Sequence, residues 1–227
     1  MLKAIFWDMD GTMVDSEPLW GQATYELSEH LGKRLTPQLR ESTVGGSFPH
    51  TLQVCAQHAG VDLAEGDYPH YRRRMFDRMG ELFADNLRPN PGVLELLDDL
   101  QQTQIPMLVT TNTERELADP SIAAVGQHFF HDSIAGDEVV HPKPAPDMYL
   151  EAARRVGARP EECLVFEDSF AGMSGAVAAG CRVIGLPESA DQPVPEGVTL
   201  LRSLHGSNSF QGVTATHVHG WFDRIPH

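Results

Sequence analysis

The chain has 227 residues and a formal net charge of −15 at neutral pH. Because nucleic acids and anionic membranes are bound by basic surfaces, this charge argues against both classes of partner. The hydrophobic fraction of 41% is sufficient for a packed interior, either in one large domain or in a core with a small insert.

Cysteine content and the first residues indicate where the protein resides. The three cysteines form no dense disulfide framework, and their odd number leaves one unpaired: Cys55, Cys163 and Cys181. Met1 to Lys3 lead directly into an apolar strand without the apolar region of a signal peptide, and no apolar stretch reaches 18 residues. We therefore expect a soluble cytoplasmic protein, either a monomer or a weak homodimer.

The first predicted strand covers residues 2–7 and is followed by two carboxylates, Asp8 and Asp10. In an open α/β sheet, ligands bind outside the carboxyl ends of the strands. Residues at positions i and i+2 share one face of an extended backbone, so both acids can reach one reacting centre before Gly11 turns the chain away. Taken alone, the pattern would equally suit an ordinary Asp-Gly turn.

Residues 15–86 show only helical patterns, which predicts a helical bundle inserted into the sheet domain. The first helix follows Ser16 as its cap and stops at Gly32, the second begins at Thr36-Pro37 and stops by Gly45-Gly46, and the third runs from near His50 to Gly60. The fourth carries an apolar stripe that predicts bundle core: Tyr68, Tyr71, Met75, Met79 and Leu82.

After residue 87 strands and helices alternate, which is typical of a parallel sheet with crossover helices. A helix is expected at 93–100, and further strands near 106–111, 132–135, 163–167 and 182–186. Pro120 should kink or shorten the helix that follows Thr113. We predict a Rossmann-like α/β core from residues 1–14 and 87–227, with residues 15–86 as a helical cap.

Polar residues follow three further strand ends: Thr111 and Asn112, Lys143 within a proline-rich loop, and Glu167 with Asp168. Each has an ordinary explanation as a helix cap, a solvated loop lysine or helix N-terminal charge. Together with the first acid pair, they predict a site for a phosphoryl group and a divalent metal.

In their order and spacing these residues resemble the four motifs of haloacid-dehalogenase-superfamily phosphohydrolases. Asp8-Met9-Asp10-Gly11-Thr12 resembles the first motif, Thr111-Asn112 the second, Lys143 the third, and Glu167-Asp168-Ser169 the fourth. The resemblance extends from Leu2 to about Leu201. The chain is most similar to the β-phosphoglucomutase and sugar-phosphatase branch, which shares Asp15-Ser16-Glu17-Pro18 and Lys143-Pro144-Ala145-Pro146.

The resemblance implies a role for each motif residue. Asp8 would be the nucleophile that forms an aspartyl-phosphate, and Asp10 would be the acid and base. Mg²⁺ would be bound by Asp8, the Asp10 carbonyl, Glu167 and Asp168. The phosphoryl oxygens would be held by Lys143, the Thr111 hydroxyl and the backbone around Met9, Gly11 and Asn112.

Substrate specificity is expected in the cap, where residues 45–51 occupy the place of the family's specificity loop. Gly46, Ser47, Phe48 and Trp20 are the expected substrate contacts. Mutases of this branch resemble one another in a histidine near position 20 and an arginine in the loop, whereas this chain has Trp20 and no arginine from 45 to 52. The other cap cations are expected to form mostly a solvated helix face, with substrate contact by one of them left open: Lys33, Arg34, Arg40, Arg72, Arg73, Arg74 and Arg78.

The sequence thus predicts a Mg²⁺-dependent phosphatase of a small phosphorylated metabolite, and a sugar phosphate is the first candidate for the substrate. A phosphomutase on the same fold is the alternative, and a non-catalytic metabolite-binding relative is less expected because no motif acid is lost. His205, His217 and His219 are interpreted as surface residues rather than a metal cluster, since no cysteine spacing supports zinc.

Overall fold

In the computed structural model, which describes residues 1–44, 46–189 and 191–225, the chain divides into two units. The first contains Met1–Asp15 and Arg88–His227, and the second contains Ser16–Leu87. Both boundaries lie one residue further along the chain than the expected boundaries between 14 and 15 and between 86 and 87.

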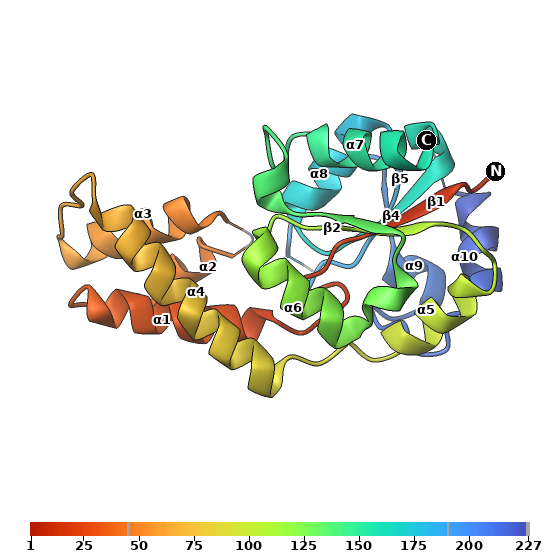
Figure 1. Ribbon diagram of the computed structural model, residues 1–227. Helices are drawn as coiled ribbons and strands as arrows, with labels where there is room; N and C mark the ends of the chain where they lie inside the picture. Colours follow the sequence, from red (N-terminus) through yellow and green to blue (C-terminus); the bar gives the residue numbers. More distant parts are fainter. Residues whose placement is uncertain (45, 190, 226–227) are drawn as a thin grey trace. The chain divides into compact units, whose positions relative to one another are not determined.

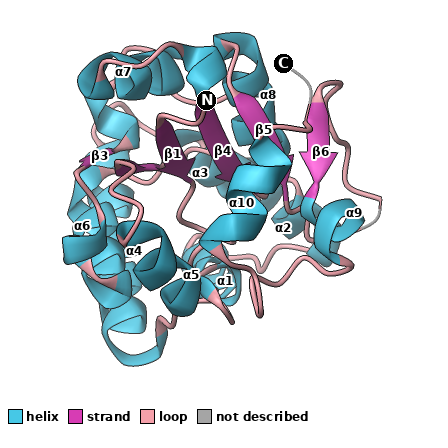
Figure 2. Cartoon of the chain, turned by 90° about the vertical axis from the view of Figure 1, so that its right-hand side faces the viewer, coloured by secondary structure: helices cyan, strands magenta, loops and turns pink. Residues whose placement is uncertain are grey.

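A parallel sheet forms the centre of the first unit (Figures 1 and 2). In the described part of the chain its strands follow the order β3-β2-β1-β4-β5-β6, and every neighbouring pair is parallel. The strands are β1 (Ala4–Trp7), β2 (Met107–Thr110), β3 (Asp132–Ile134), β4 (Cys163–Glu167), β5 (Arg182–Gly185) and β6 (Val198–Leu200). The predicted α/β class with a parallel sheet is confirmed, and β6 is a strand that the sequence analysis did not predict.

Helices cover both faces of this sheet. Helices α7 and α8 lie on one face, while α5 and α10 lie on the other (Figures 1 and 2). Their bounds, with the remaining helices of the unit, are α5 (Val93–Gln101), α6 (Arg115–Val125), α7 (Asp147–Val156), α8 (Phe170–Ala179), α9 (Leu201–His205) and α10 (Ala215–Phe222). Short 3₁₀ turns occur at Gln127–Phe129, Gly136–Glu138 and Pro160–Glu162.

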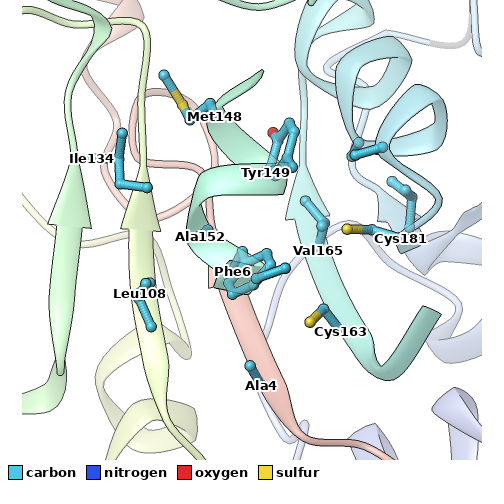
Figure 3. Close-up of a cluster of buried hydrophobic side chains, with 14 of the residues drawn as sticks. Ala4, Phe6, Leu108, Ile134, Met148, Tyr149, Ala152, Cys163, Val165 and Cys181 are labelled. Atoms are coloured by element: carbon cyan, nitrogen blue, oxygen red, sulfur yellow. The ribbon is translucent and has the colours of Figure 1, made fainter. Parts of the chain in front are cut away.

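Alternation along β1 divides its side chains between two cores. Ala4 and Phe6 join the buried cluster beneath α7 and α8, which includes Tyr149 (Figure 3). Trp7 points the other way and stacks on Phe166, with ring centroids 4.5 Å apart. Since both faces of β1 are buried, its final residues are held firmly where the two acids follow.

Helix α8 packs closely on the sheet, because most of its residues are glycine, alanine or serine. The Ser169 side chain accepts a hydrogen bond from the Gly172 N–H and caps the helix. A Cβ atom at Gly172 would overlap the carboxylate of Glu167, and one at Gly175 would press on the Ala145 carbonyl. Glycine at these positions therefore allows the helix to lie against the end of β4.

The second unit consists of helices α1 (Glu17–His30), α2 (Pro37–Glu41), α3 (Phe48–Ala59) and α4 (Asp67–Asn86). Its core draws residues from three of them: Ala23, Leu27, Leu52, Cys55, Met75, Phe76, Met79, Leu82 and Phe83. Helix α2 ends before the expected stop, and Tyr68, at the start of the predicted stripe on α4, is exposed.

Three local predictions about the chain have different outcomes. Helix α6 runs through Pro120, so it is not shortened there, and the alternative of a kink at Pro120 stays a prediction. The interpretation of the C-terminal histidines as surface residues is confirmed, since His217 is exposed and His205 and His219 are partly exposed. The helix that was not predicted there, α10, nevertheless buries Val218, Trp221 and Phe222. Arg40 is buried rather than solvated: it pairs with Glu17 and donates to the Thr43 hydroxyl at 3.1 Å.

Among the described residues, the helices are all too short or too polar to cross a lipid bilayer.

Candidate active site

The register of the two central strands places two acids side by side. β1 pairs with β4 so that Trp7 lies opposite Phe166, and the Asp8 N–H donates to the Phe166 carbonyl at 3.0 Å. The next residues, Asp8 and Glu167, therefore meet at the carboxyl edge of the sheet, where α/β proteins bind ligands. Both side chains are buried.

Lys143 supplies the positive charge between these acids. Its Nζ atom lies 2.6 Å from Asp8 Oδ1, contacts Glu167 Oε1, and donates to the Thr110 carbonyl at 2.9 Å. Its backbone is tied to Asn112, whose Oδ1 accepts from the Lys143 N–H at 2.9 Å and whose Nδ2 donates to the Lys143 carbonyl at 3.1 Å. The amide of Asn112 thus fixes the lysine loop against the end of β2.

Asp168 completes the acidic group through the turn after Asp10. Gly11 has φ = +84°, and a Cβ atom there would overlap the carboxylate of Asp168. Glycine is therefore required both by the turn and by the close approach of this acid. The Thr12 hydroxyl donates to Asp168 Oδ1 at 3.3 Å. One carboxylate oxygen from each of Asp8, Glu167 and Asp168 lies within 4.8 Å of the others.

Asp10 lies beside the hydroxyls that follow β2. Its Oδ2 atom accepts from the Thr113 hydroxyl at 2.7 Å and from the Thr111 hydroxyl at 3.4 Å. The structure thus brings Thr111 to the acid, and the predicted contact of its hydroxyl with a phosphoryl oxygen stays a prediction.

Burial and mutual repulsion determine the charge state of the group. Desolvation and the neighbouring Glu167 raise the pKa of Asp8 from 3.8 to about 8, although Lys143 opposes this shift. Desolvation and the charges of Asp8 and Glu167 raise the pKa of Asp168 well above its usual range. Burial alone would lower the pKa of Lys143, but the facing carboxylates hold it well above its usual value.

These residues fit a divalent cation that prefers oxygen ligands. Asp8 Oδ2 is buried and has no hydrogen-bond partner among the described residues. Lys143 contacts two of the three carboxylates, Asp8 and Glu167, so a second cation would relieve the repulsion that raises the pKa of Asp8 and Asp168. An all-oxygen donor set suits Mg²⁺, which also keeps several water ligands.

A pH-dependent response to Mg²⁺ follows from the raised pKa of Asp8. Because that pKa is about 8 in the folded chain and 3.8 ordinarily, the contribution of this group to stability is present below pH 4 and is lost as the pH rises through 8. Mg²⁺ binds the ionised carboxylates, so the increase in Tm that it causes should be larger at pH 8.5 than at pH 5.5. Thermal melts with EDTA or Mg²⁺ measure this; an increment that shrinks as the pH rises would contradict it.

Three residues of this site were missed by the sequence analysis. Thr113 bonds to Asp10, and Tyr149 donates from its hydroxyl to Glu167 Oε1 at 3.0 Å. Asn90 Nδ2 donates to the carbonyls of Gly11 and Thr12 at 3.0 and 2.9 Å. Thr113 lies two residues after Thr111, the same spacing as between Asp8 and Asp10. This spacing could have identified Thr113 as a candidate site residue.

The predicted cap contacts belong to the second unit. Phe48 is half-buried, with its ring 5.3 Å from Tyr68 and 6.2 Å from Phe76, and the Trp20 ring lies 6.1 Å from Phe83. Ser47 precedes α3 and Gly46 donates its N–H to the Thr43 carbonyl. Gly45, also in the expected specificity loop, lies outside the described residues. Substrate binding by these residues stays a prediction.

Comparisons with known proteins point to one family. A family model of haloacid dehalogenase-like hydrolases matches residues 2–180. The chain is 33% identical over 180 residues to the fructose-1-phosphate phosphatase YqaB of Escherichia coli, a match that covers 78% of this chain and 92% of that protein. It is 29% identical to the phosphorylated carbohydrates phosphatase of Thermotoga maritima, over 83% of this chain and 87% of that one. The crystal structure of CbbY from Rhodobacter sphaeroides in complex with xylulose 1,5-bisphosphate matches with a TM-score of 0.82 at 25% identity, covering 96% of this chain and 99% of that one.

Proposed function

The chain belongs to the haloacid dehalogenase-like hydrolase family, and from this premise we propose that it is a Mg²⁺-dependent phosphatase of a small phosphorylated metabolite, most readily a sugar phosphate. The family resemblance drawn from the four motifs is thereby confirmed. The observation that carries the proposal is the meeting of Asp8, Lys143, Glu167 and Asp168 at one sheet edge, with Asp10 two residues beyond Asp8.

Asp8 is the proposed nucleophile. Lys143 holds its Oδ1 atom, which lowers the charge repulsion that an approaching phosphate dianion would meet. In the first step a bond forms between a carboxylate oxygen of Asp8 and phosphorus, while the bond from phosphorus to the substrate oxygen breaks. The product is an aspartyl-phosphate and an alcohol.

Asp10 is the proposed acid and base. It gives a proton to the departing substrate oxygen in the first step, because an alkoxide is a poor leaving group without one. In the second step it takes a proton from the water that attacks the phosphorus of the aspartyl-phosphate. Asp8 is then released as a carboxylate together with inorganic phosphate.

The remaining residues would hold the phosphoryl group and the cation. Lys143 and the Thr111 hydroxyl are the proposed partners of the phosphoryl oxygens, with backbone N–H groups of Met9 and Asn112. The expected contribution of Gly11 is corrected, because its N–H donates to the Val14 carbonyl at 2.9 Å. Asp8, Glu167, Asp168 and the Asp10 carbonyl would hold Mg²⁺. When bound, Mg²⁺ supplies positive charge that neutralises the phosphoryl oxygens in the transition state.

The relatives and the cap sequence support a sugar phosphate substrate and hydrolysis. Two relatives are named as phosphatases of fructose 1-phosphate and of phosphorylated carbohydrates. A mutase must hold a bisphosphate by its distal phosphate, and residues 46–52 contain no arginine for this purpose.

Product analysis tests phosphatase against mutase. With Mg²⁺ and β-glucose 1-phosphate, in the presence of β-glucose 1,6-bisphosphate, we expect phosphorus NMR to show inorganic phosphate rather than glucose 6-phosphate. A parallel panel of sugar phosphates, phosphoglycolate and nucleotide monophosphates would identify the preferred substrate by phosphate release. Glucose 6-phosphate that accumulates well ahead of phosphate would identify a mutase instead.

A further inference from the structure

The carboxyl group of Asp10 is held by a residue outside the four motifs. The Thr113 hydroxyl donates to Asp10 Oδ2 at 2.7 Å, a distance typical of a strong O–H···O bond to a carboxylate. The Thr111 hydroxyl reaches the same oxygen only at 3.4 Å. Thr113 is therefore the closer of the two donors.

The backbone keeps Thr113 in this position from both sides. Its N–H donates to the Thr111 hydroxyl oxygen at 3.0 Å, and its carbonyl accepts from the Gly136 N–H at 3.1 Å. A Cβ atom at Gly136 would overlap the backbone of Asn112, so the turn after β3 packs directly on the segment after β2. The hydroxyl of Thr113 is thus carried by a fixed backbone and not by a mobile loop.

We propose that Thr113 is a positioning residue that fixes the carboxyl plane of Asp10 and keeps the transferable proton on its other oxygen, Oδ1. A hydroxyl that donates to Oδ2 occupies a lone pair there, which favours protonation at Oδ1. In the first step the proton then passes from Oδ1 to the departing substrate oxygen, and in the second step Oδ1 takes a proton from the attacking water. This inference rests on the proposed function of Asp10.

The leaving group distinguishes a positioning role from a structural one. A positioned general acid contributes about 10²–10⁴-fold to a rate, and it contributes most where the leaving oxygen is basic. If the Asp10 carboxyl loses its orientation, the hydrolysis of phenyl phosphate should slow much more than that of 4-nitrophenyl phosphate, because phenolate is the more basic leaving group. A defect in folding or in metal binding would slow both substrates alike.

The test compares kcat/KM for both aryl phosphates in Thr113→Val, Thr113→Ser and the wild-type enzyme. We expect Thr113→Val to lose about 10-fold or more on phenyl phosphate and no more than about 3-fold on 4-nitrophenyl phosphate, as a partial loss of general-acid catalysis. Thr113→Ser keeps the hydroxyl and should restore the wild-type ratio. Asp10→Asn provides the reference for complete loss of general-acid catalysis by Asp10.

Two controls separate this effect from general damage. Thr103→Val removes a hydroxyl that bonds to the Leu100 carbonyl at 2.6 Å, in the turn before β2, and should leave both rates unchanged. The increase in Tm caused by Mg²⁺ should be the same in Thr113→Val and wild type, since the Thr113 hydroxyl bonds to the side-chain carboxyl of Asp10 and not to its backbone carbonyl, the group proposed to hold Mg²⁺. If Thr113→Val does not fold, Thr113→Ala replaces it.

The possible outcomes keep the two proposals apart. If the wild-type enzyme hydrolyses neither of the two aryl phosphates in the presence of Mg²⁺, the proposed function is wrong. If the wild-type enzyme is active but Thr113→Val shows equal losses on both substrates, or no loss, the positioning role of Thr113 is overturned while the phosphatase assignment stands.

Discussion

Asp8→Asn is expected to reduce Mg²⁺-dependent hydrolysis of an aryl phosphate by roughly 10⁴-fold or more, the scale seen when a catalytic nucleophile is removed. The amide has nearly the shape of the carboxylate, but it cannot attack phosphorus and cannot offer full negative charge to a cation. Phosphate release with Mg²⁺, compared with release in EDTA, measures the effect.

The control for Asp8→Asn is the same change at an exposed position. Asp98, on the exposed side of α5, allows the same loss of one charge without touching the acid group, and Asp98→Asn should keep full activity. Circular dichroism should show that both variants are folded. Hydrolysis that survives both Asp8→Asn and chelation would contradict a mechanism in which Asp8 attacks phosphorus.

The motif acids could be predicted from the sequence because the fold itself brings them together. Parallel strands end at one edge of the sheet, so acids that follow the strands of an α/β core were expected at a common edge. The neighbouring positions of β1 and β4, which bring Asp8, Glu167 and Asp168 together, were not predicted. The alternation of buried residues along β1 then decided which side chains face the same core. Strand alternation and the acids that follow a strand can be recognised from a few neighbouring residues, and their geometry is the same in every parallel sheet.

The residues that support the acids could not be predicted in the same way. Tyr149 reaches Glu167 only because α7 crosses the sheet beside Phe6, and Asn90 reaches the Gly11 carbonyl only because the chain returns from the second unit at that point. Neither contact leaves a periodic signal. Strand β6 was not predicted for a related reason. It has only three residues, and it is a strand because it pairs with β5 rather than because of its composition.

Amphipathic patterns were also missed where polar residues were numerous. His217 and His219 lie at the surface as interpreted, but the sequence analysis did not predict that their helix, α10, has a buried face with Trp221 and Phe222. In the second unit Arg40 was grouped with six other cations, but its pairing with Glu17 removes it from solvent. A count of charges does not reveal which one has a buried partner.

Lys143→Met is expected to have the second large effect, because Lys143 is the cation that faces both Asp8 and Glu167. Its side chain is only 2% exposed, so methionine fills the space but leaves two buried carboxylates without the cation that faces them. Removal of one member of a buried ion pair typically costs about 3–5 kcal/mol of unfolding free energy. We expect a loss of this size in urea melts with EDTA, together with a large loss of phosphatase activity.

A double substitution separates charge from packing at Lys143. In the variant that combines Lys143→Met with Asp8→Asn, one unpaired carboxylate is removed with its partner, so part of the lost unfolding free energy should return. Mg²⁺ should likewise reduce the defect of Lys143→Met, because it supplies positive charge to the same acids. Lys3→Met, at an exposed position, is the matched control and should change stability little.

Two outcomes would show that Lys143 does not offset the repulsion between Asp8 and Glu167. In the first, Lys143→Met is no less stable than this control. In the second, the double variant loses as much unfolding free energy as the two single variants lose together. Lys143 would then serve the phosphoryl group alone, and its position between the acids would follow from the hydrogen bonds that hold its loop to Asn112.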